Sequence, residues 1–228
     1  MNKLDKTEVK GLTRRQAIDY YLKSPTAQRL YHDIRGRPVS VYTIYSGRRV
    51  LRRKHKGQPI IIDVLRGDKP NSLEYWALRH AVEFHRTPTT GSVVIDIDPN
   101  NVPASRLKQI VADTANQIRD VGSPEVRFSG GRGYYVLTKG SAKKSFKNLY
   151  DEVKNRMLDY AAKNKDITVT KRPGPGQTRL DLSPMRRGGT HRAIYSLDAR
   201  TGLISKPVAN LNKFNPIRDA KPPARETA

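Results

Sequence analysis

The run from Val93 to Pro99 places two carboxylates where they could hold a cation. Asp96 and Asp98 alternate there with two isoleucines. In a β-strand, side chains two residues apart share one face, which puts both carboxylates on that face about 7 Å apart. Like charges at that spacing are costly on a covered sheet unless a cation neutralises them, and Mg²⁺ or Mn²⁺ suits oxygen ligands best. The alternative is that the pair caps the end of a strand before Pro99.

Other metals fit the sequence poorly. Asp96, Asp98 and Asn100 occupy positions 1, 3 and 5 of a calcium loop, but position 6 is Asn101 instead of Gly and position 12 is Leu107 instead of Glu, which argues against a calcium site. The chain has no Cys, which excludes disulfides and any zinc or iron–sulfur site built on thiolates. A catalytic metal must therefore use Asp, Glu or His.

The segment Ser129–Gly133 carries three Gly in five residues and joins two predicted strands. Glycines allow positive φ and a close approach of backbone to a ligand, and Ser129 and Arg132 could contact phosphate. An ordinary hairpin turn is the alternative. No Walker sequence is present, because the Gly- and Pro-containing stretch 171–178 lacks the Gly-Lys-Ser/Thr ending.

The charge balance favours a polyanionic partner. There are 44 Lys plus Arg against 21 Asp plus Glu, a net charge of +23, and neutralising phosphates releases their condensed counterions. Two dense basic stretches supply our candidate residues for nucleic-acid binding, although charge runs are often only solvated faces. These candidates are Arg48, Arg52, Arg53, Lys54, Lys56, Arg186 and Arg187. Because there is no long apolar span and no apolar N-terminal segment, we expect a soluble cytoplasmic protein without a membrane partner.

The sequence pattern predicts an α/β (α+β) protein. In its N-terminal part, a capping box at Thr13–Gln16 and a Ser24-Pro25 pair start two helices, and Leu73 to Phe84 shows helical spacing that ends near His85. Three segments between them read as an antiparallel meander. Those predicted strands are 38–45, 49–53 and 59–65.

From Ser92 onwards the predicted order is a split β-α-β-β-α-β unit. Its predicted elements are strand 92–98, helix 105–121, strand 125–128, strand 134–138, helix 142–162 and a final strand. In that arrangement the first strand lies between the third and fourth, so a carboxylate on the fourth would face Asp96 and Asp98. Asp181 in 178–182 supplies one, although 167–170 competes for the same strand position.

The order of these motifs resembles the archaeo-eukaryotic primase superfamily, and within it the polymerase domain of bacterial ligase D and its stand-alone relatives. The resemblance covers about residues 13 to 208 and rests on several motifs in the same order. They are Val94–Pro99, Ser129–Val136, Leu180-Asp181 and Tyr195–Leu203, preceded by Tyr20-Tyr21, Arg35–Pro38, Lys54-His55 and Glu83–His85. The chain departs from the family at Tyr135, where the glycine-rich motif usually continues to His, and at Asp198, where relatives carry a basic residue or His.

The resemblance implies a metal-dependent, template-directed nucleotidyltransferase, a DNA primase or polymerase that adds NTP or dNTP to a 3′-hydroxyl. Asp96, Asp98 and Asp181 would hold two Mg²⁺ or Mn²⁺ ions. A second set of residues would bind the incoming nucleotide: Ser129, Gly130, Arg132, Tyr135, His85 and Arg200. Partners would be a DNA or RNA template and primer, with other replication or repair proteins. A module of the same fold that binds nucleic acid without catalysis is the alternative.

The expected layout is an N-terminal α/β lobe over residues 1–90 packed against an RNA-recognition-like catalytic lobe over 91–211. Residues 212–228, rich in Lys, Arg and Pro, are expected to form an extended or disordered basic tail.

Overall fold

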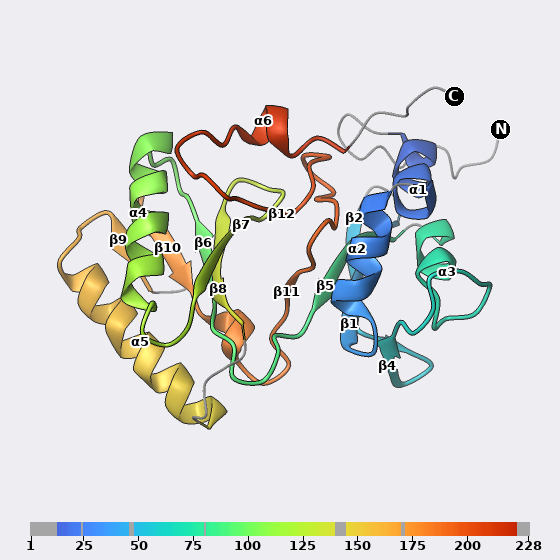
Figure 1. Cartoon of the computed structure of the whole chain (residues 1–228), viewed down its shortest axis with the longest axis horizontal. Coiled ribbons are helices and arrows are strands. Elements are labelled where there is room, and N and C mark those ends of the chain that lie inside the picture. The colour runs from blue at the N-terminus through green and yellow to red at the C-terminus, as the bar shows by residue number, and fades with distance from the viewer. Residues whose placement is uncertain are drawn as a thin grey trace. The chain divides into compact units, whose positions relative to one another are not determined.

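The computed structural model describes residues 13–23, 25–45, 48–79, 81–139, 145–169 and 172–222. Within these ranges the chain forms six α-helices, one short 3₁₀ helix and two β-sheets, so the predicted α/β class is confirmed (Figure 1). No helix in the described ranges is long and apolar enough to cross a membrane. The chain divides into two compact units. The first comprises residues up to Arg86 with 192–206 and the chain from Asn215, and the second comprises 87–191 and 207–214.

Two adjacent helices begin the first unit, α1 (Arg14–Lys23) and α2 (Pro25–Ile34). The predicted capping box is present at the start of α1: Gln16 N donates to Thr13 Oγ1 at 3.2 Å, and Thr13 N donates to Gln16 Oε1 at 2.6 Å. Gly36, at φ +67°, follows the end of α2 as predicted. The predicted cap at Ser24 lies outside the described residues.

The first sheet is organised around β1 (Pro38–Tyr45). One edge of β1 pairs antiparallel with β5 (Ala81–Arg86), and the other pairs first with β4 (Gln58–Ile61) and then with β2 (Arg48–Arg52). The sheet is completed by β3 (Lys54–His55) beside β4 and by β11 (His191–Arg192) beside β5. The hairpin of β1 and β2 agrees with the predicted meander, but β4 returns to β1 instead of pairing with β2.

The prediction that the helix from Leu73 continues to His85 is wrong. Helix α3 spans only Leu73–Leu78, with Ser72 Oγ accepting from Tyr75 N at its start, and the chain then enters β5. The apolar spacing also fits a strand over Val82–Phe84, and pairing with β1 decides between the two. Glu83 and His85 therefore share one face of a strand.

The second sheet carries the predicted split β-α-β-β-α-β order. Its strands, in spatial order, are β12 (Lys206–Pro207), β7 (Pro124–Phe128), β8 (Tyr134–Thr138), β6 (Val94–Asp98), β10 (Thr178–Asp181) and β9 (Ile167–Thr168). As predicted, β6 lies between its neighbours β8 and β10. The competing segment forms β9, which runs parallel to β10 on its outer side.

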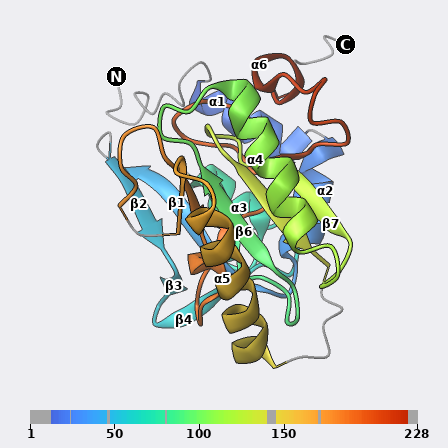
Figure 2. The ribbon, with the colours of Figure 1, turned by 90° about the vertical axis from the view of Figure 1, so that its left-hand side faces the viewer.

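Helices α4 (Ala104–Gln117) and α5 (Phe146–Ala162) pack together beside this sheet (Figure 2). The predicted inward face of α4 is buried, and Ile95 and Ile97 of β6 are fully buried with it. The core of the second unit comprises Ile95, Ile97, Ile110, Val111, Ile118, Val136, Leu149, Val153 and Met157. Alternation along β6 therefore sends Asp96 and Asp98 to the face away from these isoleucines.

The tail predicted to be extended or disordered instead contains a helix, α6 (Pro216–Asp219). Asn215 caps it, with Oδ1 accepting from Ile217 N at 3.0 Å, and Lys206 Nζ donates to Asp219 O at 2.9 Å. An Asn-Pro helix start and one lysine contact order a segment that composition alone marks as polar. Residues 192–206 belong to the first unit, whereas the sequence-based division assigned them to the second.

Candidate functional site

The three predicted carboxylates lie on two neighbouring strands of the second unit. Asp181 of β10 pairs directly with Asp96 of β6, and Arg179 pairs with Asp98. Directly opposite residues of an antiparallel pair project to the same face. Asp96, Asp98, Asp181 and Arg179 therefore share the sheet face that the buried isoleucines do not use.

Arg179 is a cation within this carboxylate group. Its guanidinium forms an ion pair with Asp181, and Nη2 lies 3.7 Å from Asp98 Oδ2. Asp181 also accepts hydrogen bonds from Ser183 N at 2.8 Å and Ser183 Oγ at 2.9 Å. The side chain of Asp98 is half exposed, whereas those of Asp181 and Arg179 are mostly covered. Arg179 thus neutralises part of the negative charge that a metal ion was predicted to neutralise.

The donor set suits a hard divalent ion, because it consists of carboxylate oxygens from adjacent strands. Nevertheless, no group of three His, Cys, Asp or Glu residues in the described part of the chain lies close enough together to hold an ion. Metal binding would require Arg179 to release Asp181.

The glycine-rich turn Ser129–Gly133 lies close to β6, the strand that carries Asp96 and Asp98. Ser129 N donates to Gly133 O at 3.0 Å, Gly131 N donates to Ser129 Oγ at 3.3 Å, and Gly130 has φ +84°. A Cβ on Gly133 would lie 2.1 Å from the carbonyl oxygen of Ile97, so only glycine fits there. Ser129 is buried and Arg132 is exposed.

Tyr135 lies beside Asp96 on β8, so Asp96 has Tyr135 on one neighbouring strand and Asp181 of β10 on the other. It pairs with Asp96 across β6 and β8, is 4% exposed, and packs edge-on against His191 with ring centroids 5.8 Å apart. A row of side chains from Asp181 through Asp96 to Tyr135 therefore crosses three strands on one face. The aromatic ring fills the place where the resemblance expects an imidazole.

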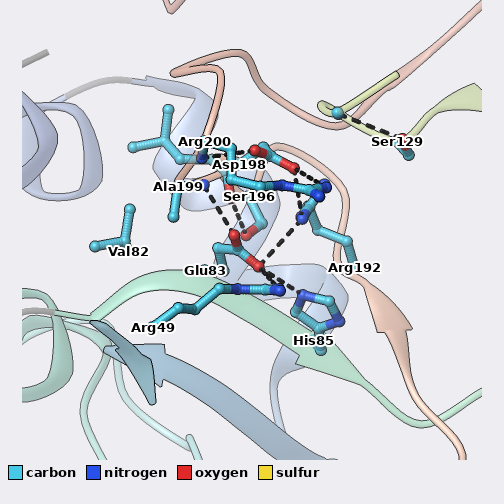
Figure 3. A network of polar contacts seen from close by, with 12 residues as sticks. Arg49, Val82, Glu83, His85, Ser129, Arg192, Ser196, Asp198, Ala199 and Arg200 are labelled. Atoms are coloured by element: carbon cyan, nitrogen blue, oxygen red, sulfur yellow. Dashed lines mark hydrogen bonds and ion pairs between the residues drawn. The ribbon is translucent and has the colours of Figure 1, made fainter. Parts of the chain in front are cut away.

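In the first unit, a buried carboxylate network surrounds Glu83 (Figure 3). Glu83 Oε2 accepts from His85 Nε2 at 3.1 Å and Arg192 Nη2 at 3.1 Å, and it also pairs with Arg49. Its Oε1 accepts from Ala199 N at 2.8 Å. The side chain of Glu83 is fully buried, so it joins three segments that are distant in sequence.

Asp198 belongs to the same network and points inward. It is fully buried, pairs with Arg192 at 2.8 Å, and its Oδ1 accepts from the backbone N of Arg200 at 2.7 Å and of Thr201 at 3.1 Å. The Arg200 side chain is 64% exposed, with Nη2 3.4 Å from Asp198 Oδ2. Asp198 therefore shapes the turn that carries Arg200 instead of facing a ligand itself.

The network shifts the protonation equilibria of its members. Burial lowers the pKa of His85 to about 4; the Glu83 hydrogen bond opposes that shift, whereas the Arg192 and Arg49 cations reinforce it. Burial alone would raise the pKa of Glu83, but Arg192, His85 and Arg49 outweigh it and hold that pKa well below its usual range. At neutral pH the structure therefore has a neutral imidazole beside an ionised carboxylate.

The predicted nucleic-acid-binding side chains are exposed in both units. Arg52, Arg53, Lys54 and Lys56 lie on and around β2 and β3, and Arg186 and Arg187 follow the 3₁₀ helix Ser183–Met185. Nothing is described for the side chain of Arg48. Of the predicted nucleotide-binding residues, Ser129, Gly130, Arg132 and Tyr135 belong to the second unit and His85 and Arg200 to the first.

The sequence pattern predicts no role for Glu83, because its helical spacing places this segment in a helix. The signal was present in the alternation of Val82, Glu83, Phe84 and His85, which puts two polar groups on one strand face.

Comparison with known proteins supports the fold. No family model matches the chain, and no curated protein matches its sequence. Among solved structures, the polymerase domain of ligase D from Mycobacterium tuberculosis, in complex with DNA, matches with a TM-score of 0.74 at 20% identity, over 89% of this chain and 84% of that one. The chain therefore has the fold of a ligase D polymerase domain, as the sequence resemblance predicted.

Proposed function

We propose that the protein is a metal-dependent, template-directed nucleotidyltransferase that extends or initiates DNA or RNA strands. The observation that carries the proposal is the pairing of Asp181 with Asp96, with Asp98 two residues along the same strand face. This carboxylate group occurs in a fold that matches a polymerase domain solved with DNA.

Asp96, Asp98 and Asp181 would hold two Mg²⁺ or Mn²⁺ ions, and no zinc is expected. When bound, such ions activate the attacking 3′-hydroxyl and neutralise charge on the triphosphate as pyrophosphate leaves. The protein's own contribution is to position charges. Ser183 restrains the Asp181 carboxylate through two hydrogen bonds, and the Ser129 turn would present the exposed side chain of Arg132 to an anion.

Basic side chains would hold the template and primer through their phosphates. This role is assigned to the exposed residues Arg52, Arg53, Lys54, Lys56, Arg186 and Arg187, together with Arg48. Contacts of this kind depend on charge and not on base sequence, which suits an enzyme that must accept any template.

The second candidate is a module that binds nucleic acid without catalysis. The ion pair of Arg179 with Asp181 favours it, because that guanidinium stands where a cation would be needed. Tyr135 in place of an imidazole favours it as well. Both candidates predict template binding, so binding of a metal and a nucleotide separates them.

Thermal unfolding with Mn²⁺ and a nucleoside triphosphate tests the proposal. A ligand that binds only the native state stabilises it by mass action, by about 2.7 kcal/mol at a concentration 100 times its Kd. We expect Mn²⁺ plus nucleotide to raise Tm by about 5 °C or more. Asp181→Asn should abolish the increase, and Asp159→Asn, an exposed carboxylate on α5, should retain it. Template binding by a protein whose Tm responds to neither Mn²⁺ nor nucleotide would select the second candidate.

A further inference from the structure

The side chain of Glu83 accepts hydrogen bonds from four different groups. Its fully buried carboxylate accepts from Arg49 of β2, His85 of β5, Arg192 of β11 and the backbone N of Ala199 (Figure 3). Buried ion pairs are weak contributors to net stability, because desolvation offsets much of their attraction. The contacts of the buried Glu83 carboxylate are therefore better explained by the geometry that they impose on its partners.

The contact between Glu83 and His85 determines which imidazole nitrogen carries the proton. An ionised carboxylate only accepts hydrogen bonds, so His85 Nε2, at 3.1 Å, must be the donor. In a neutral imidazole the other nitrogen, Nδ1, is then an acceptor. No residue in the described ranges hydrogen-bonds Nδ1, and the Tyr42 ring packs beside the imidazole with centroids 4.7 Å apart.

Burial keeps His85 neutral, and the neighbouring cations reinforce this effect. Three guanidinium groups, those of Arg49, Arg192 and Arg200, already face the two carboxylates of Glu83 and Asp198. A proton on Nδ1 would add a further positive charge to a buried cluster that has an excess of cations. The lowered pKa of His85, about 4, results first from burial, with Arg192 and Arg49 adding to the shift.

We propose that Glu83 is a positioning residue that holds His85 as the Nε2–H tautomer, so that Nδ1 accepts a hydrogen bond from an uncharged donor group of the bound nucleotide. The ligand part rests on the proposed function. Phosphate oxygens are acceptors, so a neutral His85 with this tautomer does not bind them. A sugar hydroxyl or a base amino group is the matching chemistry. Contact with phosphate falls to the exposed guanidinium of Arg200, which the Asp198 turn supports.

Nitrogen NMR of the full-length protein tests the tautomer without any ligand. The chain has five His, and the His85 signals are identified by their loss in His85→Gln. Long-range proton–nitrogen correlations at pH 7 should show Nε2 protonated and Nδ1 unprotonated in the wild type. An Nδ1–H tautomer or an imidazolium at pH 7 would overturn the proposal, whether or not any variant folds.

Two variants test whether Glu83 is responsible. Glu83→Gln replaces the obligate acceptor with an amide that can also donate, and we expect a mixture of the two His85 tautomers. Asp33→Asn is the matched control, because Asp33 pairs with Arg86 at 2.9 Å and accepts from Ile194 N at 3.0 Å in the same unit. The control should retain the Nε2–H tautomer. An unchanged tautomer in folded Glu83→Gln would show that the carboxylate does not set it.

Nucleotide analogues identify the donor group. ATP, its 2′-deoxy and 3′-deoxy forms and purine riboside triphosphate, each with Mn²⁺, are compared on wild type and His85→Ala. The analogue that lacks the group donating to Nδ1 should bind the wild type about 3- to 10-fold more weakly than ATP does. The same analogue should bind His85→Ala as tightly as ATP does. Inorganic triphosphate should bind both proteins equally. Weaker triphosphate binding by His85→Ala, or no analogue effect, would contradict the ligand part.

The two proposals fail in different ways. If the wild type binds no nucleotide, the proposed function and the ligand part are both wrong, yet the NMR result still decides the role of Glu83. If nucleotide binds and His85 has the wrong tautomer, only the further inference is wrong.

Discussion

At the scale of single residues, the alternation of Asp96 and Asp98 was sufficient to predict a charged strand face. Asp181 could be added because the strand order follows from the order of elements, and the structure pairs it with Asp96. The alternation from Val82 to His85 marks the strand face of Glu83, but the partners of its carboxylate could not be predicted in the same way. Its partner Arg192 is 109 residues away, and no local pattern records which distant segment a side chain meets.

Arg179 should compete with metal ions for the carboxylates. Arg179→Gln removes the ion pair with Asp181, and pairs of this exposure are worth about 0.5–1 kcal/mol, so Mn²⁺ should bind about 2- to 5-fold more tightly in calorimetric titration. Lys154→Gln makes the same charge change at an exposed position on α5 and serves as control. Mn²⁺ binding that is unchanged or weaker in Arg179→Gln than in the control would mean that Arg179 helps to assemble the site.

At the scale of elements, local patterns located most helices and strands, and tertiary pairing corrected the exceptions. The segment from Ala81 to Arg86 has spacing that fits a helix or a strand, and its pairing with β1 makes it a strand. The same correction moves His85 from a helix end to a strand face beside Glu83. Helix α6 begins with an Asn-Pro pair. The prediction missed this helix because it considered only the basic composition of the tail.

The turn before β8 should tolerate no side chain at Gly133. A Cβ there would lie 2.1 Å from Ile97 O and 3.2 Å from Pro99 Cδ, so Gly133→Ala must displace β6 or the turn and should cost about 2–3 kcal/mol in denaturant unfolding. Gly176→Ala is the comparison, because it meets no atom within 4 Å and carries only the strain of φ +73°, about 1 kcal/mol. Equal costs for the two variants would contradict the close approach to Ile97.

At the scale of the whole molecule, motif order predicted the fold correctly, and the charge balance predicts the class of partner. The net charge of +23 points to nucleic acid, and the ordered motifs pointed to the polymerase fold that the ligase D match shows. The division into two units was less accessible, because residues 192–206 return to the first unit through Arg192, Asp198 and Ala199. These contacts join segments that the sequence-based boundary separated.

Primer extension tests the central claim most directly, since it requires the template interface, the nucleotide site and the carboxylates together. The wild type with a primed template, Mn²⁺ and nucleoside triphosphates should lengthen the primer. The double substitution Asp96→Ala and Asp98→Ala should slow extension by at least about a thousandfold, because charge stabilisation worth several kcal/mol is lost. Asp159→Ala should match the wild type. Extension that survives the double substitution, or a wild type that binds the template and adds no nucleotide, would contradict the assignment.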